Sequence, residues 1–411
     1  MDQSVPPGRV RGICIPPCSK SYAQRALAAS LLAEGTSRLH NIEFCDDTRS
    51  AIRCIEALGA RVRRTGERTL EIDGGLSPAG DRLYVGQSGL STRLFTPIAS
   101  LCDTPIGVVG EGPLLHRSFR TMIRTLRALG VRVHDRNDHL PLHIQGPIRG
   151  GEVQIEGLVS SQFITGLMFA LPLCEEDSVI KLTSPLQSKP YADMTIAALK
   201  NFGINIYETK LGGLPMYLIK GGQKYSPCRV SVEGDYSQAA FFFTANALGS
   251  EIRVKNLIPD SVQGDKAIVD IIEKSSTGDG LEPFTVDVGD IPDLVPILAV
   301  LGCFTKGTSR IVNAARLKIK ESDRITAIAD ALNAIGGKVT AGDDFLEMQH
   351  VDRFTGGEVD PCNDHRIVMA AAIAATASDA PVIIRGAEAV NKSYPRFFED
   401  FKALGGEFEV L

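Results

Sequence analysis

The sequence predicts an α/β protein of two domains, each made of three βαβαββ repeats with pseudo-three-fold symmetry. Three observations lead to this prediction. A glycine-led segment recurs along the chain, five helical stretches end at a glycine, and 411 residues are too many for one ordinary hydrophobic core. Together they indicate two cores built from one repeated unit.

The recurring segment is Gly35–Asn41 (GTSRLHN), which returns as Gly307–Asn313 (GTSRIVN). A looser copy is Gly249–Asn256 (GSEIRVKN). Each copy follows an apolar helical stretch and precedes a polar loop and a second helix. Because both helices of each unit are largely apolar, we expect the units to close into three-fold domains rather than an open solenoid.

The second helices share an ending in which a glycine occupies the C′ position. Five of them end at Leu58-Gly59, Leu129-Gly130, Phe202-Gly203, Ile335-Gly336 and Leu404-Gly405. Subtraction of the glycine numbers gives spacings of 71, 73, 133 and 69 residues. The gap of nearly double length predicts a unit with a degenerate ending around Ala267–Asp279. The chain therefore contains six predicted repeats.

The domain boundaries follow from the order of the repeats. Repeats one to three are expected to form a domain of residues 16–228. Repeats four to six are expected to form a discontinuous domain of residues 1–15 and 229–411, because the opening strand before Pro16 should complete the sheet of the later half.

Composition limits the partners. The chain is 44% hydrophobic and 23% charged with a net charge of −5, which argues against nucleic acid or an anionic membrane as the main partner. Residues 1–11 contain no apolar signal region, and the longest apolar run, Ile367–Ala375, is too short to cross a bilayer. We expect a cytoplasmic monomer that acts on small molecules.

Nine cysteines are scattered without any Cys-x-x-Cys pair. The spacing of Cys14, Cys18 and His40 fits no zinc pattern. Reduced thiols in a cytosolic protein, with no metal, are the preferred interpretation.

The stretch Pro16–Arg25 predicts an anion site. Two prolines end an extended segment, and Ser19 or Ser21 can cap a helix that runs through Leu32. The Lys20 ammonium and the Arg25 guanidinium then lie near free backbone N–H groups at the positive end of the helix. A plain helix cap is the alternative interpretation of the two serines.

Similar polar clusters precede the other helices. Because they occupy equivalent positions in each repeat, they should gather at one end of each domain, and two such ends could line a cleft that closes on a polyanion. Most of these residues are also expected to act as ordinary caps. Lys320–Arg324 and Asp364–Arg366 favour a functional role more strongly, because bulky charges there adjoin apolar helices. The clusters before the first helices are Ser19–Ser21, Gln87–Gly89, Ser160–Gln162, Gly234–Ser237, Ile291–Asp293 and Asn363–Arg366.

The ordered set of motifs resembles the 5-enolpyruvylshikimate-3-phosphate synthases of the enolpyruvyl transferase family. The resemblance extends along essentially the whole chain. It rests on Ser19–Ser21 with Arg25, Ser160–Gln162, Ser188–Tyr191, Val232–Asp235, Lys320–Arg324, Asn363–Arg366 and Lys392. It implies two domains of three βαβαββ repeats with the active-site cleft between them, in agreement with the repeats above.

By this resemblance, the enzyme moves the enolpyruvyl group of phosphoenolpyruvate to the 5-hydroxyl of shikimate 3-phosphate and releases phosphate, a step of aromatic amino-acid biosynthesis. No metal or organic cofactor is implied. Two phosphates and two carboxylates call for many cations and hydroxyls. The implied shikimate 3-phosphate ligands are Ser21, Arg25, Ser160, Ser161, Gln162, Ser188, Tyr191, Asp293, Arg316 and Lys320. The implied phosphoenolpyruvate ligands are Lys20, Gly89, Arg117, Gln162, Arg324, Arg366 and Lys392.

Addition and elimination need one group to take the hydroxyl proton and another to protonate the methylene carbon. The resemblance assigns the first role to Asp293 and the second to Glu321. Lys320, Lys20 and His365 are implied as further catalytic groups. A carboxyl beside several cations has a lowered pKa, so Glu321 needs burial or substrate charge to act as an acid near neutrality.

Several residues depart from the family pattern, among them Cys18, where glycine is usual, and Gln24, where asparagine is usual. The chain has Gln87 and Leu90 where the family commonly has asparagine and threonine, and Arg316 where asparagine commonly contacts shikimate 3-phosphate. These changes motivate an alternative, a catalytically impaired anion-binding relative; Asp293, Lys320 and Glu321 argue against it. The sister transferase acting on UDP-N-acetylglucosamine is a second alternative, but its cysteine-bearing loop has no clear match here.

Overall fold

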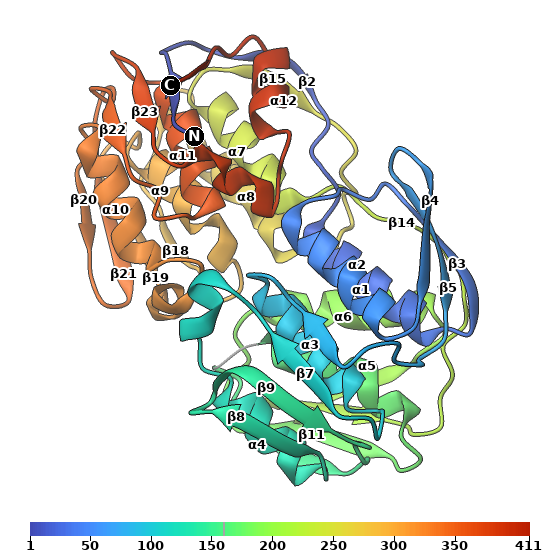
Figure 1. The fold of residues 1–411 in the computed structure, drawn as a ribbon. Helices are drawn as coiled ribbons and strands as arrows, with labels where there is room; N and C mark the ends of the chain where they lie inside the picture. Colours follow the sequence, from blue (N-terminus) through green and yellow to red (C-terminus); the bar gives the residue numbers. More distant parts are fainter. Residues whose placement is uncertain (159–160) are drawn as a thin grey trace. The chain divides into compact units, whose positions relative to one another are not determined.

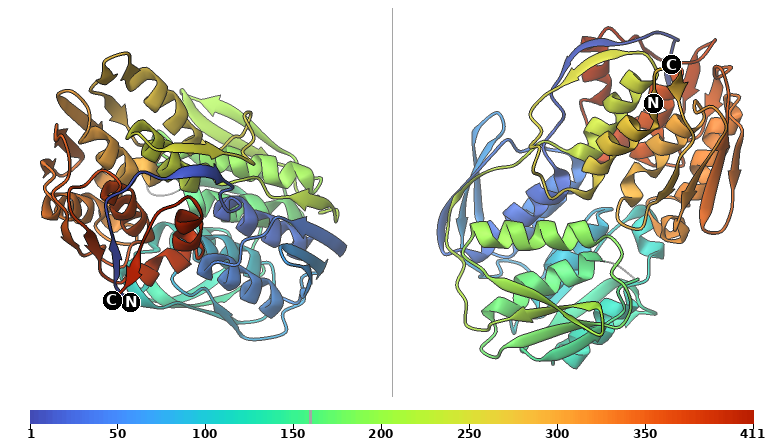
Figure 2. Two further views of the ribbon diagram at one scale, coloured as in Figure 1. Left: turned by 90° about the horizontal axis from the view of Figure 1, so that it is seen from above. Right: turned by 180° about the vertical axis from the view of Figure 1, so that it is seen from behind.

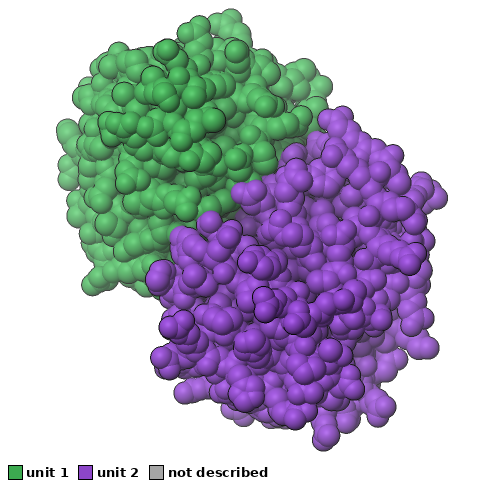
Figure 3. Space-filling view, viewed as in Figure 1, with its two compact units in different colours: residues 1–17, 234–411 green, residues 18–233 purple. Residues whose placement is uncertain are grey.

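A computed structural model describes residues 1–158 and 161–411. The chain divides into two compact units. Unit 1 combines residues 1–17 with residues 234–411, and unit 2 is the continuous segment 18–233 (Figure 3). Each unit contains its own apolar core. The predicted α/β fold with repeated βαβ units is confirmed (Figure 1).

Unit 2 contains three four-stranded sheets with one common pattern. In each sheet the first two strands are parallel and the following pairs are antiparallel. A βαβαββ repeat produces this pattern, because a helix connects the parallel strands and a hairpin adds the other two. Across the sheets the strands are β14 (Arg229–Ser231), β3 (Gly35–His40), β5 (Thr69–Gly74) and β4 (Arg61–Gly66); β6 (Arg82–Tyr84), β7 (Ile106–Val109), β9 (His139–Gln145) and β8 (Arg132–Arg136); and β10 (Glu152–Ile155), β11 (Ser178–Leu182), β13 (Leu214–Ile219) and β12 (Ile206–Leu211).

The two helices of each repeat differ in burial. In α3 (Gly89–Ala99), a first helix, every residue except Arg93 is buried. In α4 (Arg120–Ala128), a second helix, only Met122, Ile123, Thr125 and Leu126 are buried. A helix that is apolar nearly all round belongs inside the core, whereas an amphipathic helix covers it. The other helices of unit 2 are α1 (Lys20–Leu32), α2 (Asp46–Ala57), α5 (Ser161–Ala170) and α6 (Lys189–Asn201).

Unit 1 repeats the pattern with one weak member. Its two four-stranded sheets are β18 (Thr285–Asp287), β19 (Thr308–Val312), β21 (Phe345–Gln349) and β20 (Val339–Ala341), and β22 (Gly357–Val359), β23 (Val382–Ile384), β1 (Gln3–Val5) and β24 (Glu409–Val410). Its helices are α7 (Tyr236–Ala247), α8 (Ala267–Ser275), α9 (Val295–Gly302), α10 (Arg324–Ala334), α11 (His365–Ala375) and α12 (Phe397–Ala403). After α8 comes only a short hairpin of β16 (Ser276–Thr277) and β17 (Gly280–Leu281), which confirms the degenerate ending.

Two repeats take their opening strand from a distant part of the chain. Strand β2 (Arg11–Cys14) pairs in parallel with β15 (Glu251–Val254), so the N-terminal segment completes a repeat of the later half. Strand β14 pairs in parallel with β3 and therefore belongs to unit 2. The two compact units divide at 17/18 and 233/234, and the sequence analysis placed the domain boundaries at 15/16 and 228/229.

The N-terminal strand β1 lies between β23 and β24 and is antiparallel to both. The backbone N–H of Leu411 donates to the carbonyl of Asp2 at 3.0 Å, and Figures 1 and 2 both show the two ends of the chain together. The pairing agrees with the expectation that the N-terminal segment joins the later half.

Local backbone geometry explains why the recurring motifs are visible in the sequence. The three copies of the glycine-led segment form β3, β15 and β19, and each strand is followed by an asparagine with φ of 61° to 63°: Asn41, Asn256 and Asn313. Asparagine tolerates this left-handed conformation better than other non-glycine residues. The five helix-ending glycines also have positive φ, between 83° and 111°, as predicted.

None of the helices in the described part of the chain has the length and apolar character needed to cross a membrane.

Candidate functional site

The beginnings of four helices place the charged side chains of unit 1. Asp235 caps α7 by accepting from the backbone N–H groups of Ser237 and Gln238, and Asp364 caps α11 by accepting from Arg366. Asp293 lies in the 3₁₀ turn η4 (Pro292–Leu294) that leads into α9, and Arg324 is the first residue of α10. Helix starts of successive repeats thus carry the acids and the cations.

Arg324 is the centre of a buried ion network. Its side chain is 1% exposed, and its Nε lies 2.9 Å from Asp364 Oδ2. Its Nη1 lies 3.0 Å from Asp293 Oδ1, and its Nη2 lies 2.6 Å from Glu321 Oε2. Burial alone lowers the pKa of Arg324, but the charges of Asp364, Glu321 and Asp293 outweigh it, and the net pKa is raised. The guanidinium is therefore a permanent charge.

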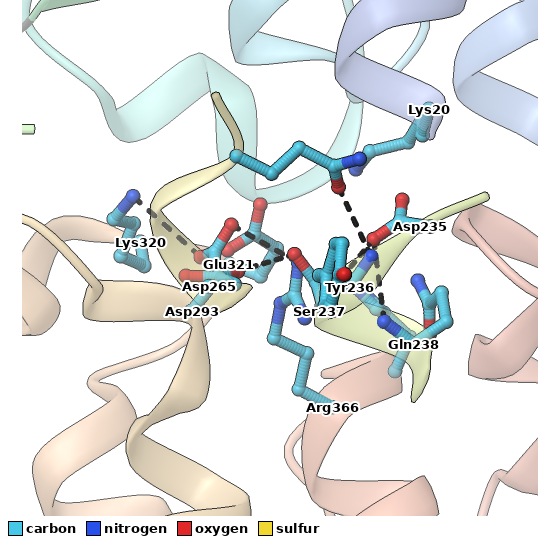
Figure 4. A network of polar contacts seen from close by, with 12 residues as sticks. Lys20, Asp235, Tyr236, Ser237, Gln238, Asp265, Asp293, Lys320, Glu321 and Arg366 are labelled. Atoms are coloured by element: carbon cyan, nitrogen blue, oxygen red, sulfur yellow. Dashed lines mark hydrogen bonds and ion pairs between the residues drawn. The ribbon is translucent and has the colours of Figure 1, made fainter. Parts of the chain in front are cut away.

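Asp293 is held by a second guanidinium. Arg366 Nη2 lies 3.0 Å from Asp293 Oδ2, and Lys320 Nζ lies 3.9 Å from Asp293 Oδ1. The Asp293 side chain is 19% exposed and that of Glu321 is 27% exposed, so both carboxylates are partly accessible beside the buried Arg324. We call Asp293, Lys320, Glu321, Arg324, Asp364 and Arg366 the Asp293 cluster. Figure 4 labels four of its members, Asp293, Lys320, Glu321 and Arg366.

Lys320 is unusual among the cations of the cluster. Burial lowers its pKa to about 8, although Asp293 and Glu321 act in the opposite direction. The charge of Arg316, on the 3₁₀ turn η5 (Ala315–Ile319), contributes to the lowering. The Lys320 side chain is 20% exposed, so it is not fully closed off from solvent. A lysine with this pKa can exchange a proton near neutrality.

The other predicted residues of unit 1 lie close to these. His365 is 2% exposed, and its Nδ1 lies 3.9 Å from Asp364 Oδ1. Lys392, at the end of the 3₁₀ turn η6 (Ala387–Lys392), donates to the carbonyl oxygen of Asn363 at 2.5 Å. The predicted substrate-binding and catalytic residues of unit 1, apart from Arg316, thus lie within or beside the Asp293 cluster. Arg316 influences the cluster electrostatically, because its charge lowers the pKa of Lys320.

In unit 2 the start of α1 carries Lys20. Ser19 caps the helix by accepting from the backbone N–H of Tyr22 at 3.4 Å, as predicted. Lys20 Nζ lies 2.8 Å from Asp47 Oδ2, near the start of α2. Ser21 is partly exposed on the next position of the helix.

Arg25 is fully buried, one turn further along α1. Its guanidinium donates to the hydroxyls of Thr195 and Thr165 at 2.9 and 3.2 Å and to the carbonyl oxygens of Ser21 and Tyr191 at 2.8 and 3.0 Å. Burial lowers its pKa to about 10. These bonds fasten α1 to α5 and α6, so Arg25 orders the helix starts that carry Ser21 and Tyr191.

A second cationic group surrounds Gly89 at the start of α3. Ser88 caps this helix by accepting from Ser91 N–H at 3.2 Å. Arg93 Nη1 donates to the Gly89 carbonyl oxygen at 3.3 Å and to Gln162 Oε1 at 3.2 Å. A Cβ on Gly89 would lie 2.8 Å from Arg117 Nη1, so this guanidinium closely approaches the glycine. We call Gly89, Arg93, Arg117 and Gln162 the Gly89 cluster.

The predicted serines of unit 2 are placed by two helix starts. Ser161 begins α5 and is 2% exposed. Ser188 precedes α6 with a left-handed backbone (φ 57°) and is 3% exposed. Tyr191 accepts from Arg25 through its carbonyl oxygen. The predicted Ser160 lies outside the described residues.

Four residues that the sequence analysis did not single out belong to these groups: Arg93, Thr165, Thr195 and Asp265. Arg93 could have been found, because it lies one helical turn after Gly89 in a helix that is otherwise buried. The two threonines carry no such indication, since they contact Arg25 from 140 and 170 positions away.

Asp265 joins the Asp293 cluster from the 3₁₀ turn η3 (Gly264–Lys266). It accepts a hydrogen bond from the Ser237 hydroxyl, shown in Figure 4. Burial, and after it the charge of Asp293, raises the pKa of Asp265 to about 7.

The chemistry available follows from these groups. A partly exposed carboxylate lies against two guanidiniums and a lysine of low pKa, which suits anion binding combined with proton transfer. Within residues 1–158 and 161–411, no three His, Cys, Asp or Glu side chains are grouped so that they could hold a metal ion.

Comparison with known proteins identifies the family. The family model of EPSP synthase (3-phosphoshikimate 1-carboxyvinyltransferase) matches residues 5–401. A relative from Clostridium novyi (strain NT), named 3-phosphoshikimate 1-carboxyvinyltransferase, is 41% identical and covers 97% of this chain and 96% of its own. A protein of the same name from Clostridium perfringens is 38% identical and covers 98% of both chains.

Solved structures show the same fold. EPSP synthase from Acinetobacter baumannii aligns with a TM-score of 0.83 at 24% identity and covers 99% of both chains. The enolpyruvyl transferase NikO from Streptomyces tendae aligns with a TM-score of 0.79 at 15% identity, over 99% of this chain and 98% of the other. At these identities the likeness concerns the fold alone. The family match and the curated relatives, over nearly the whole length, show that this chain belongs to the EPSP synthase family.

Proposed function

We propose that this enzyme transfers the enolpyruvyl group of phosphoenolpyruvate to the 5-hydroxyl of shikimate 3-phosphate, and that Asp293 takes the hydroxyl proton. The family supports the reaction. The observation that supports the residue is the Asp293 carboxylate, which lies 3.0 Å from each of two guanidiniums and keeps part of its surface exposed. Lys320 Nζ lies 3.9 Å from the same carboxylate.

The reaction proceeds by addition and elimination. The 5-oxygen forms a bond to C2 of phosphoenolpyruvate as Asp293 takes its proton, and Glu321 protonates the methylene carbon. In the elimination, the new methyl group loses a proton and the C2–O bond to phosphate breaks, so that phosphate leaves. Lys320 is suited to exchange protons in both stages, because burial lowers its pKa to about 8.

The positions of Arg324 and Arg366 suggest how Asp293 becomes available as a base. In the structure Arg324 and Arg366 both hold Asp293, which makes it a weak base. We infer that the carboxylate of phosphoenolpyruvate binds the same two guanidiniums and thereby frees Asp293. Lys20, Gly89, Arg117, Gln162 and Lys392 are proposed as further phosphoenolpyruvate ligands.

For shikimate 3-phosphate we propose the hydroxyls of Ser21, Ser160, Ser161, Ser188 and Tyr191, with Gln162, Arg316, Asp293 and Lys320. Arg25 was expected among these ligands. Because each of its four hydrogen bonds goes to protein oxygens, we propose that it acts mainly by ordering Ser21 and Tyr191.

We further propose that the enzyme works as a monomer in a reducing compartment such as the cytoplasm. Within the described residues no cysteine is joined in a disulfide bond, which is the state expected there. Sedimentation of the purified protein tests the monomer.

The deciding experiment measures phosphate release with both substrates, each substrate alone, and UDP-N-acetylglucosamine in place of shikimate 3-phosphate. We expect release only with shikimate 3-phosphate and phosphoenolpyruvate together. Asp293→Ala should lose release while keeping its folded circular dichroism spectrum, whereas Asp352→Ala, an exposed acid of the same unit, should be unaffected. Saturable binding without release would establish the impaired relative instead, and release with the nucleotide sugar would establish the sister transferase.

A further inference from the structure

Asp265 is a buried carboxyl whose hydrogen bonding is incomplete. It is 3% exposed. Its Oδ2 accepts from the Ser237 hydroxyl, whereas its Oδ1 has no hydrogen-bond partner among the described residues. An unpaired polar atom in the interior costs stability, and such atoms are rare in native proteins. The position of Asp265 therefore calls for an explanation other than packing.

The groups that face Asp265 are charged. They are Asp293 from η4, Arg366 from α11 and Asp235 from the start of α7, and the Ser237 hydroxyl donates to Asp265 Oδ2. Arg366 stabilises the charged form of Asp265, and the two aspartates oppose it. Arg366 is also one of the two guanidiniums that hold Asp293. The charge of Arg366 thus acts on both carboxyls, and Arg366 contacts Asp293 directly.

We propose that Asp265 is a positioning residue that sets the proton affinity of Asp293 by its own charge and through Arg366, which contacts Asp293. The inference rests on the proposed function, in which Asp293 takes the hydroxyl proton. When Asp265 is charged, it attracts Arg366 and repels the negative charge of Asp293. Both effects make Asp293 a stronger base.

The charge on Asp265 changes within the working pH range. Burial and the charge of Asp293 raise its pKa to about 7. Because the two carboxyls interact, the apparent pKa belongs to the pair. As the pH rises through this value, the pair loses a proton, Asp293 becomes more basic, and kcat rises.

The first test compares kcat and KM of wild type and Asp265→Asn. Asparagine has the same shape as the neutral carboxyl, so the kcat of the variant should equal that of wild type near pH 6. The variant should lack the rise of kcat with pH, so its kcat should be roughly tenfold lower than that of wild type near pH 8. The KM for each substrate should change little. Asp352→Asn removes one exposed acid from the same unit and should keep the rise. A wild-type pH profile in Asp265→Asn overturns the proposal.

Ser237→Ala provides a second variant. The Ser237 hydroxyl donates to the charged form of Asp265 and lowers its pKa. Its removal should therefore move the inflection of kcat to higher pH without abolishing it. An unmoved inflection contradicts the proposal even if Asp265→Asn fails to fold.

A measurement without substrates separates this proposal from the proposed function. Carboxyl ¹³C NMR of the free protein should show an aspartate that titrates near neutrality, is missing in Asp265→Asn and is shifted in Ser237→Ala. If wild type releases no phosphate, the proposed function fails, and with it the role assigned here. If wild type releases phosphate and no such titration is found, only the role of Asp265 fails.

Discussion

Arg324 Nε lies 2.9 Å from Asp364 Oδ2, and neither side chain is more than 1% exposed. Removal of one member of a buried pair leaves the other charge without compensation. Asp364 also accepts from Ser322 and from the backbone N–H of Arg366. The pair therefore stabilises the start of two helices and fixes the cation that binds Asp293.

The first prediction concerns the stability that this pair provides. Asp364→Ala should lower the free energy of unfolding by about 3 to 5 kcal/mol, measured by urea denaturation. Asp323→Ala is the matched control, because Asp323 caps α10 in an exposed position and its loss should cost about 1 kcal/mol. Equal effects of the two substitutions would contradict the role of the buried pair.

The second prediction concerns Arg25. Lysine cannot reproduce four hydrogen bonds from a planar guanidinium, so Arg25→Lys should cost about 2 kcal/mol of unfolding free energy. Arg124→Lys, on the exposed face of α4, should stay within about 0.5 kcal/mol of wild type. If Arg25→Lys unfolds like wild type but binds shikimate 3-phosphate much more weakly, Arg25 is a direct ligand and not an ordering residue.

The third prediction is a pH dependence of stability. The pKa of Lys320 is about 8 in the folded protein, below the ordinary value of 10.5. Between these values the unfolded chain binds more protons, so stability rises with pH across this window. Lys320→Met should therefore be more stable than wild type near neutrality, and its advantage should shrink between about pH 8 and pH 10.

Urea denaturation at several pH values measures this effect. Lys318→Met is the control, because the hydrogen bond to Asp343 raises the pKa of Lys318 and its protonation does not change in that window. A constant difference between wild type and Lys320→Met would show that Lys320 has an ordinary pKa.

The fourth prediction tests the Gly89 cluster. A Cβ at residue 89 would lie 2.8 Å from Arg117 Nη1 and 3.0 Å from Arg93 Nη1. Both contacts are to the ends of flexible side chains, so Gly89→Ala should fold while displacing the cations. We expect kcat/KM for phosphoenolpyruvate to fall roughly 10- to 100-fold. Gly80→Ala, where a Cβ has open space, should behave as wild type, and an unchanged KM in Gly89→Ala would place phosphoenolpyruvate elsewhere.

The repeats could be predicted from the sequence because the residues that end their strands and helices are determined by local backbone conformation. Asn41 and Asn313 follow their strands with left-handed backbone, and Gly203 and Gly336 end their helices in the same way. Each of these conformations favours particular residue types, which leaves a visible pattern. The pairing of β14 with β3 left no such pattern, because strand partners are chosen by contacts across about two hundred residues.

The same distinction applies to the site. The sequence indicated that Asp293, Arg324 and Asp364 begin helices, and the structure brings their side chains together. It could not indicate that Arg25 donates to Thr165 and Thr195, because both partners come from another repeat. Asp265 was missed for a similar reason. It lies in the repeat with the degenerate ending, and the residues around it come together only when the chain folds.

The position of β1 determines an order of assembly during synthesis. Gln3 pairs with Ile384 and Val410, so β1 has no partner until the residues of β23 and β24, about four hundred positions later, have been made. Unit 2 is continuous and can fold as soon as residue 233 has emerged. Strand β2 can pair once β15 has been made, whereas β1 must stay unpaired until β23 and β24 arrive on either side of it.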